Sequence, residues 1–401
     1  MTATDDRAGG ASDRPLRIFL IAGEPSGDVL GARLMAALKR RTGGAVEFAG
    51  VGGERMAAEG LRSLFPMSEL SVMGIAEIVP RIGGLLRRIS ETAAAIRQRR
   101  PDAVVTIDAP AFSVRVLRRI AGTGIPKIHY VAPTVWAWRP WRARKFAAVV
   151  DRLMVLLPFE PPWFERAGLA ATFVGHPVLE GGVASADGAR FRTAHGIAAR
   201  APLLCVLPGS RRGEVSRLLP PFADAVARLH RRFPDLQIVI PTVGNVAAEV
   251  RTMTAGWAPR VTIVEGDRDK YDAMAASDAA LAASGTVALE LALSGVPTVI
   301  GYRVHPLTAA ILRRMVTVSH FSLVNILLGR EAVPEFFQSA CRGDLLAAAV
   351  LPLLTDATAA DAQRRAMAEA VGMLSPPDGT PSDAAASVVL SLADWTEKEG
   401  A

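Results

Sequence analysis

Short apolar runs alternate with longer amphipathic stretches along most of the chain. The apolar runs are rich in β-branched residues, as in buried strands. The stretches between them repeat apolar residues every three to four positions, as in helices. Short strands separated by amphipathic helices predict βαβ units and a parallel sheet. The first strands are expected at 16–23, 45–53 (with a turn), 103–108, 127–131 and 152–158, and the helices between them at 26–41, about 74–99 and 112–121.

A segment rich in glycine and small residues interrupts this alternation at 175–190. Strand-like runs resume beyond it, so we expect a domain boundary there. The predicted fold class is α/β, with two facing Rossmann-like domains and a cleft between them. The expected parts are a disordered tail at 1–14, an N-terminal domain at 15–177, a C-terminal domain at 178–356, and C-terminal helices at 357–401 that pack back on the N-terminal domain, the last starting after an N-cap at Thr380.

Length and composition exclude several classes of protein. The chain has 401 residues, enough for two ordinary domains, and half of them are hydrophobic, so it is neither disordered nor fibrous. Its two cysteines, Cys205 and Cys341, lie far apart without a C-x-x-C pattern, and the six histidines form no H-x-x-x-H pair. We therefore expect a reducing compartment, no disulfide framework and no metal site.

The charge of the chain leaves three kinds of partner open. A net charge of +7 and a pI near 10.0 suit nucleic acid, an anionic membrane surface or a phosphorylated substrate. No DNA or RNA recognition signature accompanies the charge, so no nucleic-acid partner is expected. The first residues lack an apolar signal segment. No uncharged apolar stretch approaches the ~20 residues that span a bilayer. We expect a protein that is soluble or, at most, peripheral to a membrane.

The turn after the first predicted strand, AGEPSGDVLG, carries candidate ligand-facing residues. Its glycines stand four apart, so it lacks the G-x-G-x-x-G dinucleotide fingerprint. Glu24 and Ser26 are expected to face the cleft and to bind the nucleotide donor. The alternative is an ordinary helix start in which Ser26 or Asp28 is the cap.

The second half opens with an equivalent turn, LPGSRRGEVSRL, in which Gly209, Ser210 and Arg211 precede a helix. The free amides of a helix start, with an arginine beside them, suit a diphosphate. Two solvated arginines at a helix start are about as compatible with this pattern.

A third turn, SGTVALELALSGVP, lies between a strand and a helix further along. The amides of Ser284, Gly285 and Thr286 are expected to approach a phosphate closely. Glu290 shares a helix face with Thr286, and a carboxylate there can accept hydrogen bonds from both ribose hydroxyls. The helix dipole alone also favours an acid near a helix start, but it does not explain a glutamate inside an apolar run.

The strand predicted at 103–108 ends in a carboxylate, Asp108, two residues before Pro110. A buried, unpaired carboxylate is costly. However, open α/β sheets bind their ligands at the carboxyl edge of their strands. Asp108 is therefore a candidate catalytic residue, and the alternative is a turn cap before Pro110.

Two further segments combine basic residues with apolar or aromatic ones. The helix expected at about 74–99 has an apolar stripe flanked by arginines. It can lie on an anionic leaflet or simply pack on the sheet, and Pro80 and the pair Gly83–Gly84 indicate an irregular, partly exposed segment. The segment 129–145 interleaves Trp and Arg, which suits a membrane interface, a sugar-stacking wall or a core; His129 within it is expected to be structural. The candidate membrane or acceptor residues are Val72, Met73, Ile82, Leu85, Leu86, Arg87 and Arg88.

Taken together, the motifs AGEPSGD, VMGIAE, IDAPAF, HYVAPTVWAWR, FVGHP, LPGSRRGEV, ASGTVALE and SLVNILLGRE resemble the lipid-A-disaccharide synthase family, in order over about residues 16–354. The resemblance implies the glycosyltransferase-B (GT-B) fold. The implied reaction is inverting transfer of 2,3-diacylglucosamine from its UDP derivative to 2,3-diacylglucosamine 1-phosphate, giving a β-1,6 disaccharide and UDP. It also implies an acceptor-binding first domain, a UDP-sugar-binding second domain, and a position at the cytoplasmic face of the inner membrane; a homodimer is a weaker implication.

The resemblance also implies residue roles. Asp108 would be the general base for the acceptor's 6-hydroxyl, and Arg211 with helix amides would stabilise the leaving UDP, with no metal. Asn325 and Gln338 would touch the donor. The chain departs from the family motif IDAPDFN at Ala111 and Ser113, and has Val324 where SLPN is expected. The alternatives are a UDP-N-acetylglucosamine 2-epimerase and a non-catalytic nucleotide-sugar or lipid binder.

Overall fold

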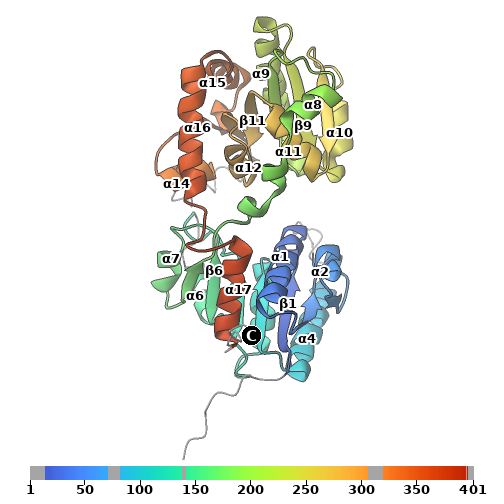
Figure 1. The fold of residues 1–401 in the computed structure, drawn as a ribbon, viewed down its shortest axis with the longest axis vertical. Coiled ribbons are helices and arrows are strands. Elements are labelled where there is room, and N and C mark those ends of the chain that lie inside the picture. The colour runs from blue at the N-terminus through green and yellow to red at the C-terminus, as the bar shows by residue number, and fades with distance from the viewer. Residues whose placement is uncertain (1–13, 71–81, 138–140, 306–318, 394, 396–401) are drawn as a thin grey trace, which may run out of the picture. The chain divides into compact units, whose positions relative to one another are not determined.

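The computed structural model describes residues 14–70, 82–137, 141–305, 319–393 and 395. Two compact units divide the chain (Figure 1). Unit 1 is Met1–Pro177 with Ser375–Ala401, and unit 2 is Val178–Leu374. This division falls at the predicted boundary between 177 and 178. The predicted N-terminal tail falls almost wholly outside the described residues, which begin at Arg14.

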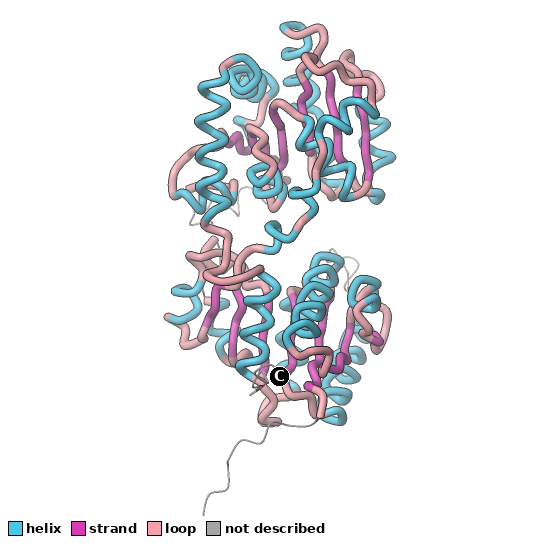
Figure 2. Tube along the Cα trace, viewed as in Figure 1, coloured by secondary structure: helices cyan, strands magenta, loops and turns pink. Residues whose placement is uncertain are grey.

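Unit 1 is a seven-stranded parallel sheet with helices on both faces (Figure 2), in the strand order β3-β2-β1-β4-β5-β6-β7. Its central pair is in register at Leu20 and Val105. The strands are β1 (Leu16–Ala22), β2 (Val46–Val51), β3 (Arg62–Ser63), β4 (Ala103–Ile107), β5 (Lys127–Tyr130), β6 (Arg152–Val155) and β7 (Ala171–Phe173). The helices are α1 (Pro25–Arg41), α2 (Glu54–Ala58), α4 (Ile82–Arg99), α5 (Pro110–Arg119), α6 (Arg142–Ala147), α7 (Pro161–Glu165) and α17 (Pro381–Leu392).

The core of unit 1 lies on both faces of this sheet because successive strand side chains point to opposite sides. Phe19 and Ile21 of β1 belong to the cluster that α4 and α5 cover. Ile18 and Leu20 belong to the cluster that α1 and α17 cover. A strand buried on both faces explains why these segments are continuously apolar rather than alternating.

Unit 2 repeats the plan with six parallel strands in the order β10-β9-β8-β11-β12-β13. The α/β architecture with two doubly wound units is therefore as predicted. The strands are β8 (Leu203–Leu207), β9 (Gln237–Thr242), β10 (Val261–Glu265), β11 (Ala279–Ala283), β12 (Thr298–Tyr302) and β13 (Glu335–Phe337). The helices are α8 (Gly188–Ala194), α9 (Arg212–Arg232), α10 (Gly244–Thr254), α11 (Asp267–Ala276), α12 (Val287–Leu293), α14 (Leu323–Leu328), α15 (Gly343–Thr355) and α16 (Ala357–Gly372).

The C-terminal helices divide between the two units, which corrects the expectation that 357–401 packs on the N-terminal domain. Helix α16 packs against α12, α14 and α15 within unit 2, and Gln363 on it accepts a hydrogen bond from the backbone N–H of Thr298. Only α17 returns to unit 1, where it packs against α1 (Figure 1). Thr380 caps α17 as predicted, accepting from the N–H of Asp383.

The position where the strand order changes direction fixes where each unit can bind a ligand. In unit 1 this position lies between β1 and β4, and in unit 2 it lies between β8 and β11. Open α/β sheets bind ligands outside the carboxyl ends of the strands at such positions. The turns that contain Glu24, Asp108, Ser210 and Ser284 follow these four strands.

Among the described residues, no single helix is long and apolar enough to cross a membrane. The consecutive helices α15 and α16 meet the criterion only when taken together, with a bend of 98° between them.

Candidate active site

The carboxylate of Asp108 lies at the end of β4, on a tight turn into α5. Asp108 and Ala109 both have left-handed backbone, with φ of 52° and 45°, a conformation that Asp tolerates better than most residues. The Asp108 N–H donates to the carbonyl of Tyr130, and Ser113 Oγ donates to the Asp108 carbonyl. The backbone is thus held from both sides while the side chain stays half-buried.

Burial raises the pKa of the Asp108 carboxyl above its ordinary value of 3.8, and one hydrogen bond from the Ala109 N–H lowers it in part. Within the described part of the chain, no lysine or arginine forms an ion pair with this carboxylate. A raised pKa and an unneutralised carboxylate at a ligand-binding edge suit a general base, because proton affinity is what a base supplies.

The neighbouring turn after β1 packs directly against Asp108's own turn. A Cβ on Gly23 would lie 2.5 Å from the Cβ of Ala109, so glycine is required for this close approach. Ser26 is exposed and Glu24 is partly buried at this edge. The cap expectation is wrong: α1 begins at Pro25 with Glu24 as its N-cap. Asp28 is instead buried and accepts from the N–H groups of Gly53, Arg55 and Met56 at the start of α2.

The predicted membrane or acceptor residues do not all reach the surface. Val72 and Met73 lie outside the described residues, as does the side chain of Ile82. Leu86 is 46% exposed and Arg87 is exposed. Leu85 packs against the core.

Arg88, another of the predicted membrane or acceptor residues, makes its contacts within unit 1. It pairs with both carboxylate oxygens of Glu69, bonds Glu91 and lies 4.5 Å over the ring of Phe65. The glycine pair 83–84 lies inside α4 and does not interrupt it. Arg88 therefore helps to hold α4 to unit 1 instead of facing outward.

The Trp-rich segment divides between core and surface. Trp136 is buried and donates its Nε1–H to Glu160 Oε1 over 3.0 Å. Trp141 is 55% exposed and starts α6. His129 is fully buried, with Nδ1 2.7 Å from Thr106 Oγ1, and burial lowers its pKa to about 3. The structure thus agrees with a structural role for His129.

Unit 2 contains a cavity of about 360 Å³ at its own change of strand order. Seven of the predicted donor residues line it, and these come from the turns after β8 and β11 and from helix α12. They are Gly209, Ser210, Arg211, Ser284, Gly285, Thr286 and Glu290. Gly285 is exposed, has a φ of 153° and has nothing within 4 Å of where a Cβ would stand, so a ligand has room to approach this part of the turn.

The first wall of this cavity is held by Glu214, one turn into α9. Its Oε2 accepts from the N–H of Ser210 and its Oε1 pairs with Arg211 at 3.1 Å. Asn245 of α10 donates to the Ser210 carbonyl. Arg211 keeps 61% of its side chain exposed, so its other donors face solvent. The start of α9, with this cation beside it, is a suitable anion site.

The opposite wall carries Glu290, paired with two groups that the sequence did not suggest. Lys270 Nζ lies 2.9 Å from Glu290 Oε1, and the Tyr271 hydroxyl donates to the same oxygen over 3.2 Å. Burial works against the charged ammonium, but the Glu290 carboxylate holds the pKa of Lys270 above its ordinary value. Lys270 also lines the cavity and adds positive charge there.

The structure does not bring Asn325 to this cavity, which corrects its expected role. Its side chain is fully buried and satisfied: Oδ1 accepts from the N–H groups of Ala332 and Val333, and Nδ2 donates to the Val333 carbonyl and Glu335. Asn325 therefore orders the loop that leads into β13. Gln338 has a φ of 53° and donates to the Val304 carbonyl, and it is not among the residues that line the cavity.

The residues missed by sequence reasoning are Lys270, Tyr271, Glu214 and Asn245. Each acts across a separation that periodicity does not reveal, apart from Glu214, which stands four residues after Ser210. One available signal was the rarity of lysine: the chain has only Lys39, Lys127, Lys145, Lys270 and Lys398. A lysine in an arginine-rich chain marks a position where a compact ammonium serves better than a planar guanidinium.

Two doubly wound parallel sheets, each with a polar edge at its change of strand order, are the plan of the GT-B fold. A structure of S. aureus MnaA with UDP matches with a TM-score of 0.66 at 14% identity, covering 96% of this chain and 99% of that one. The glycotransferase of kitacinnamycin matches with a TM-score of 0.61 at 18% identity, covering 94% and 99%. These likenesses show the fold.

Sequence comparison then gives the family. The model of a protein family described as "Lipid-A-disaccharide synthetase" matches residues 18–376. The lipid-A-disaccharide synthase of Rhodospirillum centenum is 56% identical over 382 residues, covering 94% of this chain and 95% of that protein. The chain belongs to the lipid-A-disaccharide synthetase family and is a glycosyltransferase, as the motifs predicted. An epimerase is not favoured.

Proposed function

We propose that this protein transfers 2,3-diacylglucosamine from its UDP derivative to 2,3-diacylglucosamine 1-phosphate, with inversion, to form the β-1,6 disaccharide of lipid A and UDP. Family membership supports the overall reaction. The observation that carries the mechanism is the half-buried Asp108 carboxylate at the ligand-binding edge of unit 1, with a raised pKa and no described cation beside it.

In this mechanism Asp108 takes the proton of the acceptor's 6-hydroxyl as its oxygen attacks the anomeric carbon of the donor. The new bond forms from O6 to that carbon, and the bond from the carbon to the UDP oxygen breaks with its electron pair. A single displacement inverts the centre, so no sugar–enzyme intermediate is required. Only the ionised form of Asp108 can act, and lowering the pH through its raised pKa would stop the step.

Unit 2 would hold the UDP. The amides of Ser284, Gly285 and Thr286 and the start of α9 with Arg211 suit the diphosphate, and Glu290 suits the ribose hydroxyls. Arg211 and Lys270 supply positive charge for the leaving group, so the reaction as proposed uses no metal or other cofactor. We therefore expect UDP release to be unchanged by EDTA. Loss of activity that added Mg²⁺ restores would contradict this part.

The acyl chains of both substrates require access to a membrane. We propose that the exposed Leu86 and Arg87 of α4 contribute to peripheral attachment at the cytoplasmic face of the inner membrane. Vesicles containing phosphatidylglycerol should bind the wild type more strongly than the double variant Leu86→Ser, Arg87→Ser. A homodimer, expected from the family resemblance, is tested by sedimentation in detergent.

The reaction is tested by UDP release in mixed micelles that contain both acylated substrates. We expect release only when the donor and the acceptor are both present, with formation of a disaccharide. The epimerase alternative would instead convert UDP-N-acetylglucosamine to its 2-epimer. A protein that binds UDP but turns over neither lipid would overturn the catalytic proposal, and Ala111 would then be the first residue to revert to Asp.

A further inference from the structure

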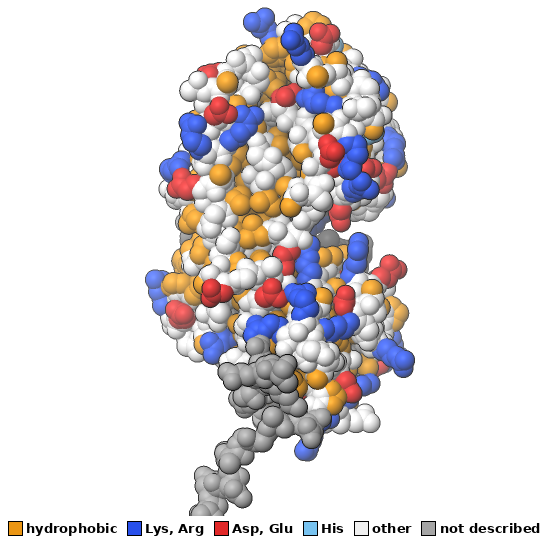
Figure 3. Space-filling model, in the orientation of Figure 1, with side chains coloured by type: hydrophobic (Ala, Val, Ile, Leu, Met, Phe, Trp, Pro, Cys, Tyr) orange, Lys and Arg blue, Asp and Glu red, His pale blue; other side chains and the backbone are white. Residues whose placement is uncertain are grey.

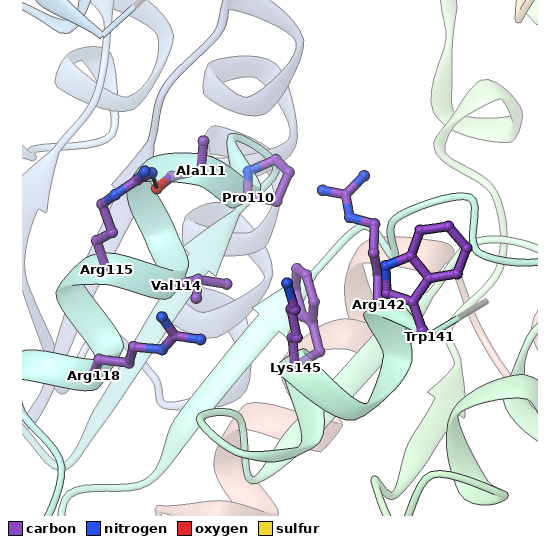
Figure 4. Close-up of a pocket in the computed structure, with 9 residues that line it drawn as sticks. Pro110, Ala111, Val114, Arg115, Arg118, Trp141, Arg142 and Lys145 are labelled. Atoms are coloured by element: carbon purple, nitrogen blue, oxygen red, sulfur yellow. Dashed lines mark hydrogen bonds between the residues drawn. The ribbon is translucent and has the colours of Figure 1, made fainter. Parts of the chain in front are cut away.

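A second cavity, of about 410 Å³, lies in unit 1 between α5 and α6. It starts at Pro110 and Ala111, the first residues of the helix that follows Asp108, and extends along both helices (Figure 4). It is therefore separate from the nucleotide cavity, which lies in unit 2. The lining residues are Pro110, Ala111, Val114, Arg115, Arg118, Trp141, Arg142, Lys145 and Phe146.

The lining contains four cations and no acid among the described residues. Figure 4 shows Arg118 and Lys145, from the two helices, extending into the space between them, with Arg142 at the start of α6. Arg115 donates to the carbonyl of Ala111. Over each unit on the face in Figure 3, Lys and Arg side chains are instead interspersed with Asp and Glu.

Three of the cations that line this cavity form no ion pair with the described residues. No described carboxylate pairs with Arg115, Arg118 or Lys145, whereas Arg14, Arg40 and Arg88 of the same unit each pair with one. Like charges that converge on one space repel each other, and an anion that enters relieves the repulsion. Guanidinium and ammonium groups together provide the fork and point charges that bind phosphate.

The position of the cavity relates it to Asp108. Val114 lies about one helical turn, and Arg118 about two turns, along α5 from Pro110, or about 5 to 11 Å. In a hexose, the 6-hydroxyl is carried by C6, which is attached to C5, and a 1-phosphate is attached to C1. C5 and C1 are the two neighbours of the ring oxygen. A sugar whose 6-hydroxyl meets Asp108 can therefore place its 1-phosphate over the first turns of α5. The exposed Trp141 offers a face for the sugar or its acyl chains.

We propose that the cavity between α5 and α6 binds a phosphate monoester, and that its source is the 1-phosphate of the acceptor lipid. This inference rests on the proposed function and specifies how the acceptor is recognised. Arg118 of α5 and Lys145 of α6 bind the phosphate from opposite sides, and this contact sets the orientation in which the 6-hydroxyl reaches Asp108. Both are substrate-binding residues and take no part in the proton transfer.

The test compares two acceptors: diacylglucosamine 1-phosphate and the same lipid without its phosphate. The variants are Arg118→Ala, Lys145→Ala and their combination. The matched control is Arg119→Ala, the adjacent exposed arginine of the same helix, which does not line the cavity. Each cavity variant should lower kcat/KM for the phosphorylated acceptor by at least about tenfold, the value of one charge-assisted hydrogen bond. None of the three cavity variants should change kcat/KM for the dephosphorylated acceptor or the KM of the donor.

Three outcomes would overturn the inference. An equal loss of kcat/KM with both acceptors would mean that the cations do not recognise the phosphate. An equal loss in Arg119→Ala would mean that the general charge of α5 matters and the cavity does not. A loss of binding to phosphatidylglycerol vesicles that parallels the loss of activity with both acceptors would assign the cavity to a membrane headgroup. Competition by millimolar inorganic phosphate, in wild type only, would support the inference.

Failure of this inference is distinguishable from failure of the proposed function. If the wild type releases no UDP with either acceptor, the glycosyl transfer itself is wrong. If the wild type turns over both acceptors with equal kcat/KM, the transfer stands and only the phosphate site is wrong. Circular dichroism of each variant separates a binding defect from misfolding.

Discussion

At the scale of single residues, the carboxylates of this protein differ mainly in what surrounds them. Asp28 is buried but caps α2 through three N–H groups, and Asp108 receives a single local hydrogen bond. Glu160, only 3% exposed, accepts from Trp136 Nε1 and from the N–H groups of Leu156 and Leu157. Burial outweighs these bonds and raises the pKa of Glu160 to about 7.

Glu160 should therefore make the stability of the protein depend on pH. Its pKa is higher in the folded chain than the 4.5 of an ordinary glutamate, so between these values the folded state binds a proton that the unfolded state has lost. Stability should fall as pH rises from about 4.5 to about 7, by at most about 1.4 kcal/mol per pH unit from this group. Urea unfolding of wild type and Glu160→Gln at several pH values measures this.

The difference in unfolding free energy between wild type and Glu160→Gln carries the result. The unfolding free energy of the wild type, relative to that of Glu160→Gln, should be larger near pH 4.5 than near pH 7. Ion pairs elsewhere are the same in both proteins, so their pH dependence cancels in this difference. A difference that stays constant from pH 5 to 8 would show that Glu160 titrates normally.

A second prediction at this scale concerns Glu290. Removing its carboxylate with Glu290→Ala should raise the Kd for UDP by about tenfold or more, because hydrogen bonds to the ribose hydroxyls are lost. The difference should shrink when 2′-deoxy-UDP is the ligand, since one of those hydroxyls is then absent. Isothermal titration measures both, with the exposed Glu331→Ala as control. An equal effect on both nucleotides would place Glu290 away from the 2′-hydroxyl.

At the scale of elements, glycines show where the strand and helix backbones tolerate no change. A Cβ on Gly50 of β2, whose φ is 141°, would lie 1.8 Å from the carbonyl oxygen of Leu20 on β1. Gly83 of α4 has nothing within 4 Å in the described structure. We expect Gly50→Ala to destabilise the protein by at least about 3 kcal/mol. Gly83→Ala should stabilise it by about 0.5–1 kcal/mol.

Urea unfolding of the two glycine variants provides matched measurements, because both make the same chemical change in the same unit. A stable Gly50→Ala protein would mean that β2 does not pair with β1 in the register Leu20 to Gly50. A destabilised Gly83→Ala protein would mean that the first turn of α4 is not helical in solution.

The elements themselves were predictable from the sequence, and so were the turns that carry the sites. Continuous apolar runs mark strands buried on both faces, and polar residues at their ends, such as Asp108 and Ser284, mark the ligand edge. The roles of Asn325 and Arg88 could not be predicted in this way. Asn325 is saturated by a loop that folds back on it, and Arg88 is held by Glu69, nineteen residues away. Sequence spacing gives no measure of such partners.

At the scale of the whole molecule, the chain builds one candidate half-site in each unit. Unit 1 supplies Asp108 and the cationic cavity, and unit 2 supplies the nucleotide cavity. The boundary after Pro177 could be predicted because composition changes there. The end of unit 2 could not: α16 and α17 are both helical in pattern, and their different partners, α12 and α1, are a matter of tertiary packing. This division also predicts that binding and catalysis can be separated by mutation.

The role of Asp108 as the general base is tested most directly by the rate of UDP release by Asp108→Asn, measured together with the affinity of this variant for UDP. Asparagine tolerates the left-handed backbone at this position and can still accept from the Ala109 N–H, so the fold should persist. We expect the kcat of Asp108→Asn to be about 10²–10⁴-fold lower than that of the wild type. The Kd for UDP should be unchanged, because the nucleotide cavity lies in the other unit. A variant that keeps activity within a few-fold of wild type would contradict Asp108 as the base.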